Sequence, residues 1–194
     1  MCKIMRLLFF FFACAVFFPS QDLLAKIIYQ ETTEYYEIKG GSDRELKKMM
    51  QSLGPKGSDG KRYYAHTAWQ VNWNFYMGRR FGGCMIAGIQ TTVNVKYLMP
   101  KWVDEKNGPE MVQKHWREFM QALQEHEKGH ADIAMKAAKE IEEALPRTKL
   151  QPVCEAVAKK ANESGQEIIN KFVAMEKDYD SKTKHGKTQG AVFN

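Results

Sequence analysis

Two histidines and a glutamate within residues 125–134 have the types and the spacing of a metal-dependent hydrolytic site. His126, Glu127 and His130 form an HExxH motif. Residues four apart lie on the same face of a helix, so the two imidazoles can bind one ion. Glu127 lies about a quarter turn away and can reach a water molecule as general base. We therefore predict a Zn²⁺ site with His126 and His130 as ligands and Glu127 as the catalytic base.

The apolar spacing of the surrounding segment supports this interpretation. Extending the three-four pattern from Leu123 to Ile133 predicts buried residues at positions 126 and 130, and both are histidines. An unpaired buried polar group costs roughly 1 to 3 kcal/mol, and a metal ion satisfies one nitrogen of each ring. The alternative is a pair of structural histidines that form hydrogen bonds in the core. The glutamate between them favours the metal site.

The third ligand is not determined by the motif. A metzincin would have Gly and His at the positions occupied by Ile133 and Lys136, so that class is excluded. Glu163, beside the apolar stripe of the next helix, would give a site completed by a carboxylate. His185, in a glycine-rich tail, would give a three-histidine site, and the glycines would let that tail turn back over the helices. Asp180 is a further carboxylate within reach of the same region.

Alternating apolar and polar residues predict the strands, and the 3.6-residue period predicts the helices. A β-branched and aromatic stretch over 26–39 is typical of an edge strand, and two alternating runs from Ala65 to Phe75 and from Ile89 to Tyr97 form an antiparallel hairpin. Ser42 caps a short helix that ends at Leu53. A long helix follows Pro100 and ends before Pro146, and a second begins near Pro152 and reaches Tyr179.

These elements define an α+β fold: an antiparallel sheet with a long hairpin, packed against a pair of long helices of which one carries HExxH. We expect residues 1–25 to be a signal peptide, with a basic start, a phenylalanine-rich apolar run and a cleavage site after Ala25. Residues 26–194 then form a single metallohydrolase-like domain. The apolar run is too short to be a stable membrane anchor, which predicts a periplasmic or secreted protein.

The cysteines and the net charge indicate the compartment of the protein and the kind of partner it binds. Removal of the leader leaves Cys84 and Cys154, which we expect to form a disulfide in an oxidising compartment. The net charge is +6 and the isoelectric point is near 9.0. Lysines and arginines are scattered among glutamates, so the charge indicates a solvated basic surface and no nucleic-acid partner.

Several motifs together resemble the bacterial domain of unknown function 922 family, described as predicted secreted zinc-dependent proteases. They are the tryptophan-rich hairpin, Cys84, the run from Trp116 to Leu123 before HExxH, Cys154, and the terminal pattern from Tyr179-Asp180 through His185-Gly186 to Gln189-Gly190-Ala191. The resemblance covers nearly the whole chain after the leader. It implies a zinc protease, and its terminal signature favours His185 over Glu163 as third ligand.

The predicted function is therefore a zinc-dependent hydrolase that acts on a peptide or protein, such as a cell-envelope peptide. Glu127 removes a proton from water, and Tyr179 is the predicted stabiliser of the oxyanion. The alternative is a non-catalytic envelope protein with a structural metal site that binds a partner. Glu127 separates the two, because a structural zinc site has no use for a free carboxylate beside an open ligand position.

Overall fold

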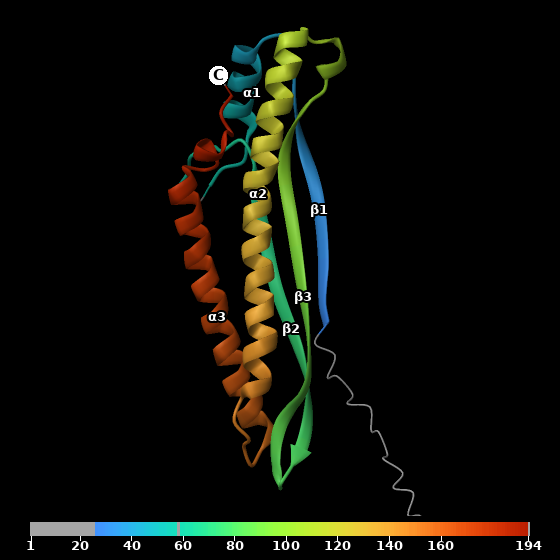
Figure 1. The fold of residues 1–194 in the computed structure, drawn as a ribbon, viewed down its shortest axis with the longest axis vertical. Coiled ribbons are helices and arrows are strands. Elements are labelled where there is room, and N and C mark those ends of the chain that lie inside the picture. Colours follow the sequence, from blue (N-terminus) through green and yellow to red (C-terminus); the bar gives the residue numbers. More distant parts are fainter. Residues whose placement is uncertain (1–25, 58, 194) are drawn as a thin grey trace, which may run out of the picture.

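The computed structural model describes residues 26–57 and 59–193, which form a three-stranded sheet and three α-helices (Figure 1). The predicted signal peptide lies outside the described residues. In chain order the strands and α-helices are β1 (Lys26–Ile38), α1 (Asp43–Leu53), β2 (His66–Arg80), β3 (Gly83–Trp102), α2 (Glu110–Ala144) and α3 (Cys154–Thr183). Three short 3₁₀ turns join or follow them: η1 (Glu105–Asn107), η2 (Leu145–Arg147) and η3 (Lys187–Gln189).

The sheet is mixed, which corrects the purely antiparallel sheet predicted from the sequence. Its strand order is β1-β3-β2; β2 pairs with β3 antiparallel, as predicted for a hairpin, while β1 pairs with β3 in parallel. The parallel pairing follows from the connection between β1 and β2. Helix α1 crosses one end of the sheet, so β2 begins one strand position away from β1, and β3 later occupies the position between them. Strand β3 runs in the same direction as β1, so the two strands pair in parallel.

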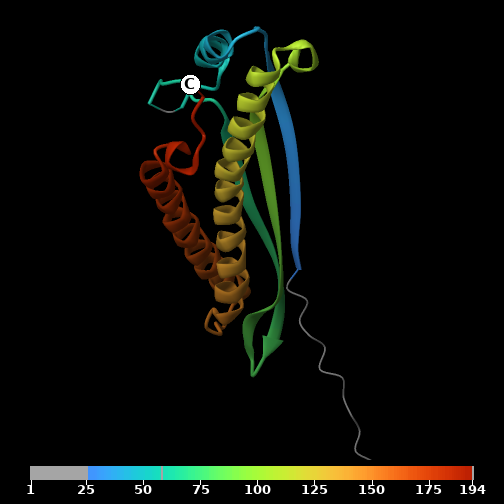
Figure 2. The same cartoon turned by 45° about the horizontal axis from the view of Figure 1, so that its top comes forward.

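The two long helices cover one face of the sheet (Figure 2). Helix α2 packs on β2 and β3, and α3 lies against α2 and is tied to β2 by Trp73 Nε1, which donates to Asn162 Oδ1 at 3.0 Å. Side chains of β2 alternate between this buried face and an exposed polar face. Two hydrophobic clusters fill the interior, one between the sheet and the C-terminal half of α2, the other between its N-terminal half and α1.

The helix boundaries match the sequence prediction except at the end of α3. Ser42 caps α1 and accepts a hydrogen bond from Glu45 N, and α2 ends before Pro146. Helix α3 runs one turn beyond the predicted end at Tyr179 and stops at Thr183, where Lys184 takes a left-handed conformation. Asp180 is therefore a residue of the last helical turn, and the tail begins only after it.

A disulfide joins Cys84, at the start of β3, to Cys154, at the start of α3, and confirms the predicted pairing. The Cα atoms lie 5.0 Å apart, and the bridge closes a loop with a sequence separation of 70 residues. Cys84 and Gln151 also exchange two backbone hydrogen bonds beside it. The bridge therefore fixes the start of α3 to the sheet.

We predict that the Cys84→Ala/Cys154→Ala double variant loses roughly 4 kcal/mol of unfolding free energy, because a loop of this length restricts the unfolded chain. Denaturant unfolding of the variant beside the oxidised parent measures the loss. Peptide mapping without reductant should recover residues 84 and 154 in one linked fragment. Two separate fragments carrying modified thiols would show that the bridge does not form.

Within residues 26–57 and 59–193, no helix combines the length and the apolar character needed to cross a membrane.

Candidate metal centre

The two histidines of the HExxH motif lie in the interior, on the face of α2 that meets α3. His126 is 3% exposed and His130 is 5% exposed. Leu123, one turn before them, belongs to one hydrophobic cluster, and Ala131 and Ile133 belong to the other. The apolar spacing of α2 thus buries both imidazoles as predicted, at the junction between the two clusters.

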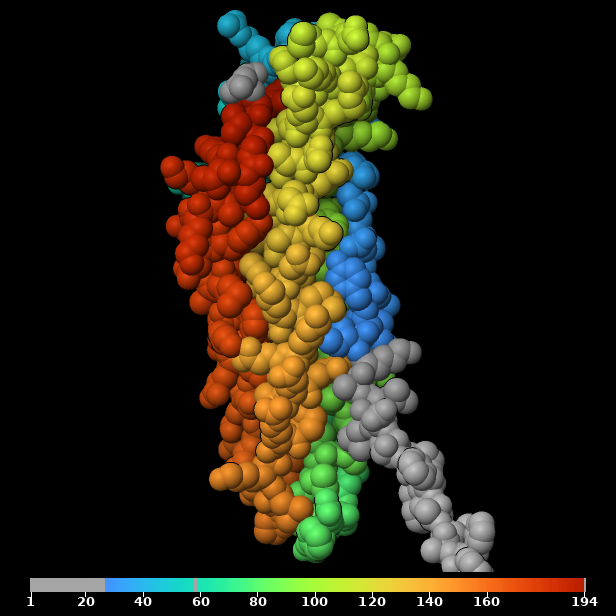
Figure 3. Space-filling model, in the orientation of Figure 1, coloured from blue at the N-terminus to red at the C-terminus, as the bar shows by residue number. Residues whose placement is uncertain are grey.

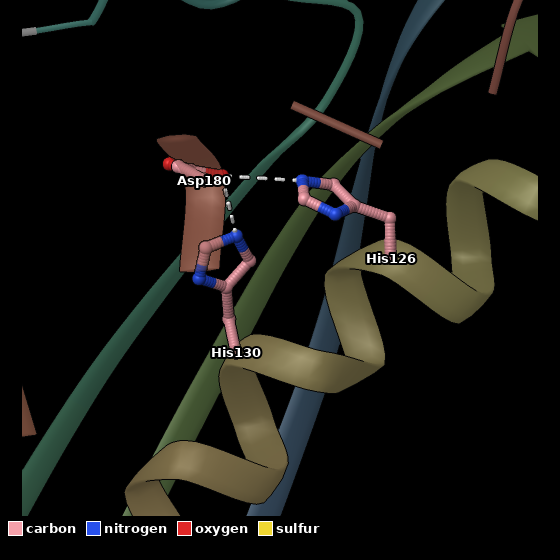
Figure 4. A group of neighbouring side chains, drawn as sticks. All are labelled: His126, His130 and Asp180. Atoms are coloured by element: carbon pink, nitrogen blue, oxygen red, sulfur yellow. Dashed lines mark ion pairs between the residues drawn. The ribbon is translucent and has the colours of Figure 1, made fainter. Parts of the chain in front are cut away.

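Helix α3 supplies a carboxylate that faces both rings (Figure 4). Asp180 Oδ1 lies 3.2 Å from His126 Nε2 and 3.2 Å from His130 Nε2. One ligand atom from each of the three residues lies within 4.8 Å of the other two, so His126, His130 and Asp180 form a group that could hold a metal ion. The helices run in opposite directions (Figure 1), and Asp180 in the last turn of α3 meets the HExxH segment of α2.

The donor atoms fit a cation. Asp180 Oδ1 is buried and accepts no well-directed hydrogen bond from a described residue, although both Nε2 atoms lie 3.2 Å away. A buried carboxylate oxygen without a directed hydrogen bond is costly, and a metal ion would satisfy it together with the two imidazole nitrogens. Two imidazoles and one carboxylate are also the ligand types of catalytic zinc sites.

The close contacts within the group shift the pKa values of His130 and Asp180. Burial lowers the pKa of an imidazole, but the carboxylates of Asp180 and Glu176 outweigh burial and raise the pKa of His130 to about 9. For Asp180, burial acts to raise the pKa, while the imidazoles of His126 and His130 outweigh it and hold the pKa of that carboxyl well below its usual range. Both shifts arise because the imidazoles and the carboxylates of the group lie close to one another.

A second layer of residues holds the rings in place. Gln189, in the tail, accepts a hydrogen bond from His126 Nδ1 at 2.9 Å through its Oε1, and this contact directs Nε2 toward Asp180. Glu176 Oε1 lies 3.4 Å from His130 Nδ1, within ion-pair distance of the other ring but without the geometry of a hydrogen bond. Partners of this kind fix the tautomer and the orientation of metal-binding histidines.

Tyr179 packs between these elements. Its ring stacks on His126, with centroids 5.1 Å apart, and meets His130 edge-on at the same distance. Its hydroxyl donates to the backbone oxygen of His126 at 3.1 Å and accepts from Gln189 Nε2 at 3.1 Å. A Cβ on Gly129 would overlap the phenol, so the glycine of His-Glu-Lys-Gly-His is required by the approach of Tyr179.

Glu127 is 4% exposed and points toward the sheet side of α2, where Thr67 Oγ1 of β2 donates to its Oε2 at 2.6 Å. Its negative charge also contributes to the raised pKa of His130. A buried carboxylate with one oxygen fixed by a hydroxyl is a positioned acceptor for a proton.

The third member of the group is Asp180, one of the alternatives that the sequence left open, rather than the predicted His185. The His185 ring lies at the edge of the site, with Nδ1 3.4 Å from Asp180 Oδ1, and packs on Tyr63 with centroids 4.4 Å apart. Positive φ values at Lys184 and His185 turn the chain away at this point. Glu163 lies farther back on α3, 59% exposed and 4.0 Å from Lys159, outside the group.

Three supporting residues were missed by the sequence reasoning. Glu176 and Asp180 are four apart and lie on one face of α3, in the same spacing as His126 and His130, so the pair was detectable in the sequence. Gln189 belongs to the terminal pattern of the family resemblance, but that pattern gave it no role, and Thr67 carried no signal, because the contacts of both residues depend on the tertiary fold.

These features define an α+β protein with a candidate metal centre between two antiparallel helices. A family model described as "bacterial protein of unknown function" (DUF922) matches residues 33–186, and the chain belongs to this family. No curated protein matches the chain, and no solved structure matches it either. The family match covers the end of β1, all of β2 and β3, both long helices and all three residues of the group.

Proposed function

We propose that this protein is a zinc-dependent hydrolase, specifically a peptidase, that works in the periplasm or after secretion. The observation that carries the proposal is the convergence of His126, His130 and Asp180, with the buried Glu127 next to His126 in the HExxH motif. A disulfide between Cys84 and Cys154 supports an oxidising compartment.

In the proposed reaction His126 Nε2, His130 Nε2 and Asp180 Oδ1 hold the ion. Zinc bound by three protein ligands lowers the pKa of a water molecule and polarises a carbonyl. Glu127 takes the proton of the attacking water and passes it to the leaving amine. Thr67 keeps the carboxylate in position through its hydrogen bond to Oε2, which leaves the proton transfer to Oε1.

Two side chains can stabilise the oxyanion, and their contacts give them different roles. The Tyr179 hydroxyl, which we predicted for this role, would have to exchange its bond to the His126 backbone oxygen for one to the substrate. His185 is 45% exposed at the edge of the site and needs no such exchange. Both side chains therefore belong to the proposed catalytic machinery, with Tyr179 also positioning His126.

A groove beside the centre supports an extended peptide as substrate. It has a volume of about 360 Å³ and lies between residues 66–71 of β2 and the side chains of Ile169, Val173 and Glu176 on α3. Strand β2 ends the sheet, so its outer backbone groups can pair with an added strand. Glu176 at the groove also contacts His130, and Thr67 contacts Glu127, so a peptide in this groove would lie next to the proposed chemistry.

The test is metal-dependent cleavage of a fluorogenic peptide library whose positions are varied one at a time. We expect the zinc-loaded protein to cleave members of the library, a chelator to stop cleavage, and added zinc to restore it. The His130→Ala variant is the control, because zinc should not restore its activity. One bound zinc per chain without cleavage of any library member would contradict the peptidase proposal and favour the structural metal site.

A further inference from the structure

The end of the molecule opposite α1 carries exposed apolar side chains that the site does not use. Figure 3 shows this end of the β2–β3 hairpin, in green, projecting at the bottom. Phe81 at its tip is 87% exposed, and Leu150 and Val153, in the segment between α2 and α3, are 44% and 54% exposed. Leu150 packs on Gly83 and the backbone of Gln151 pairs with Cys84, so the two segments form one surface.

Phe81 is an unfavourable residue for its own turn. It has φ +50 and Gly82 has φ +77, so both central residues of this two-residue turn are left-handed, as in a type I′ turn. Asn or Gly suits the first of these positions, while a bulky side chain is strained there. Packing does not compensate for the strain, because the ring contacts mainly the guanidinium of Arg80, 4.8 Å from its centroid.

Cationic side chains surround this apolar tip. Residues 76–85 and 146–156 contain four cations, Arg79, Arg80, Arg147 and Lys149, and one anion, Glu155. All four cations are exposed, and none forms an ion pair with a described residue. An apolar tip surrounded by unpaired cations is complementary to an anionic lipid surface, where the ring enters the interface and the cations meet the headgroups.

We propose that the hairpin tip, defined as Phe81, Leu150 and Val153 with the four cations around them, docks the protein peripherally on an anionic phospholipid membrane. The shape favours a lipid surface over a protein partner, because a projecting turn can enter a fluid interface without a matching pocket. The disulfide between Cys84 and Cys154 keeps the two segments together. By the helix rise from His130 to Ala144, the metal centre lies roughly 20 Å from the end of α2 that is nearest the tip.

Flotation with lipid vesicles tests the proposal and does not depend on the proposed function. The protein, purified in the form that the cell accumulates, is mixed at 0.1 M salt with vesicles of phosphatidylcholine alone or with 30% phosphatidylglycerol. We expect binding to the anionic vesicles only. Phe81→Asn should lower the partition coefficient roughly tenfold or more. Arg79→Gln/Arg80→Gln should lower it by about fivefold for each charge removed.

Phe81→Asn and the control variant Tyr35→Asn distinguish a loss of membrane docking from a loss of folding stability. Asparagine suits the type I′ turn, so Phe81→Asn should not lower the melting temperature. Tyr35→Asn removes another aromatic, 55% exposed on β1, and should leave binding unchanged. The proposal is overturned if the parent does not float with anionic vesicles, or if Phe81→Asn binds as tightly as the parent. A parent dimer that Phe81→Asn converts to a monomer, without vesicle binding, would assign the tip to self-association instead.

Discussion

Asp180→Ala is expected to abolish stoichiometric zinc binding, while His185→Ala retains it. The reason is geometric: Asp180 Oδ1 faces both Nε2 atoms at 3.2 Å, whereas His185 approaches only Asp180. Structural zinc sites contribute about 10 to 16 kcal/mol, so one of four ligands is worth about 3 to 4 kcal/mol, or several hundredfold in affinity. Titration with zinc in the presence of a competing chelator measures this loss.

Two further variants make the comparison specific. Glu163→Ala removes a carboxylate from the same helix at an exposed position and should leave affinity unchanged. Asp180→Asn keeps the shape and removes the charge, and should weaken binding by an amount between the parent and Asp180→Ala. If instead His185→Ala lost the metal and Asp180→Ala kept it, the three-histidine site predicted from the sequence would be the correct one.

The helix that carries the HExxH motif could be predicted from the sequence because its signals are local. The apolar period of α2 runs through His126 and His130, so the same residues that define the helix also define which face is buried. The disulfide was predictable for a similar reason, since Cys84 and Cys154 are the two cysteines outside the predicted signal peptide. Neither inference needed the relative position of two distant elements.

The third ligand could not be derived, because it depends on how far α3 extends and how it lies against α2. Met175 is 38% exposed, and the inward face of α3 continues from Phe172 through Glu176 to Asp180. Ending the helix at Tyr179 moved Asp180 into the tail and drew attention to His185. The parallel pairing of β1 was missed for a related reason: alternation along a strand shows its faces and does not show its neighbour.

Glu127→Gln is expected to keep the metal and to lose hydrolysis by about 10²- to 10⁴-fold in kcat. The substitution preserves the size of the side chain, and Thr67 Oγ1 can still donate to the amide oxygen, so the local packing of α2 on β2 is retained. The amide has no capacity to take a proton from water. Metal analysis and kinetics on the same preparation therefore measure the two properties separately.

A second glutamate in the same helix, Glu125, provides the matched control. Glu125→Gln makes the same chemical change two residues earlier on α2, at an exposed position, and should leave kcat within a factor of two. Glu127→Gln with the activity of the parent would remove the general base from the proposal. A fall in zinc content together with activity would instead assign Glu127 to the metal-binding group, because a residue that only carries a proton should not change the affinity of the three ligands.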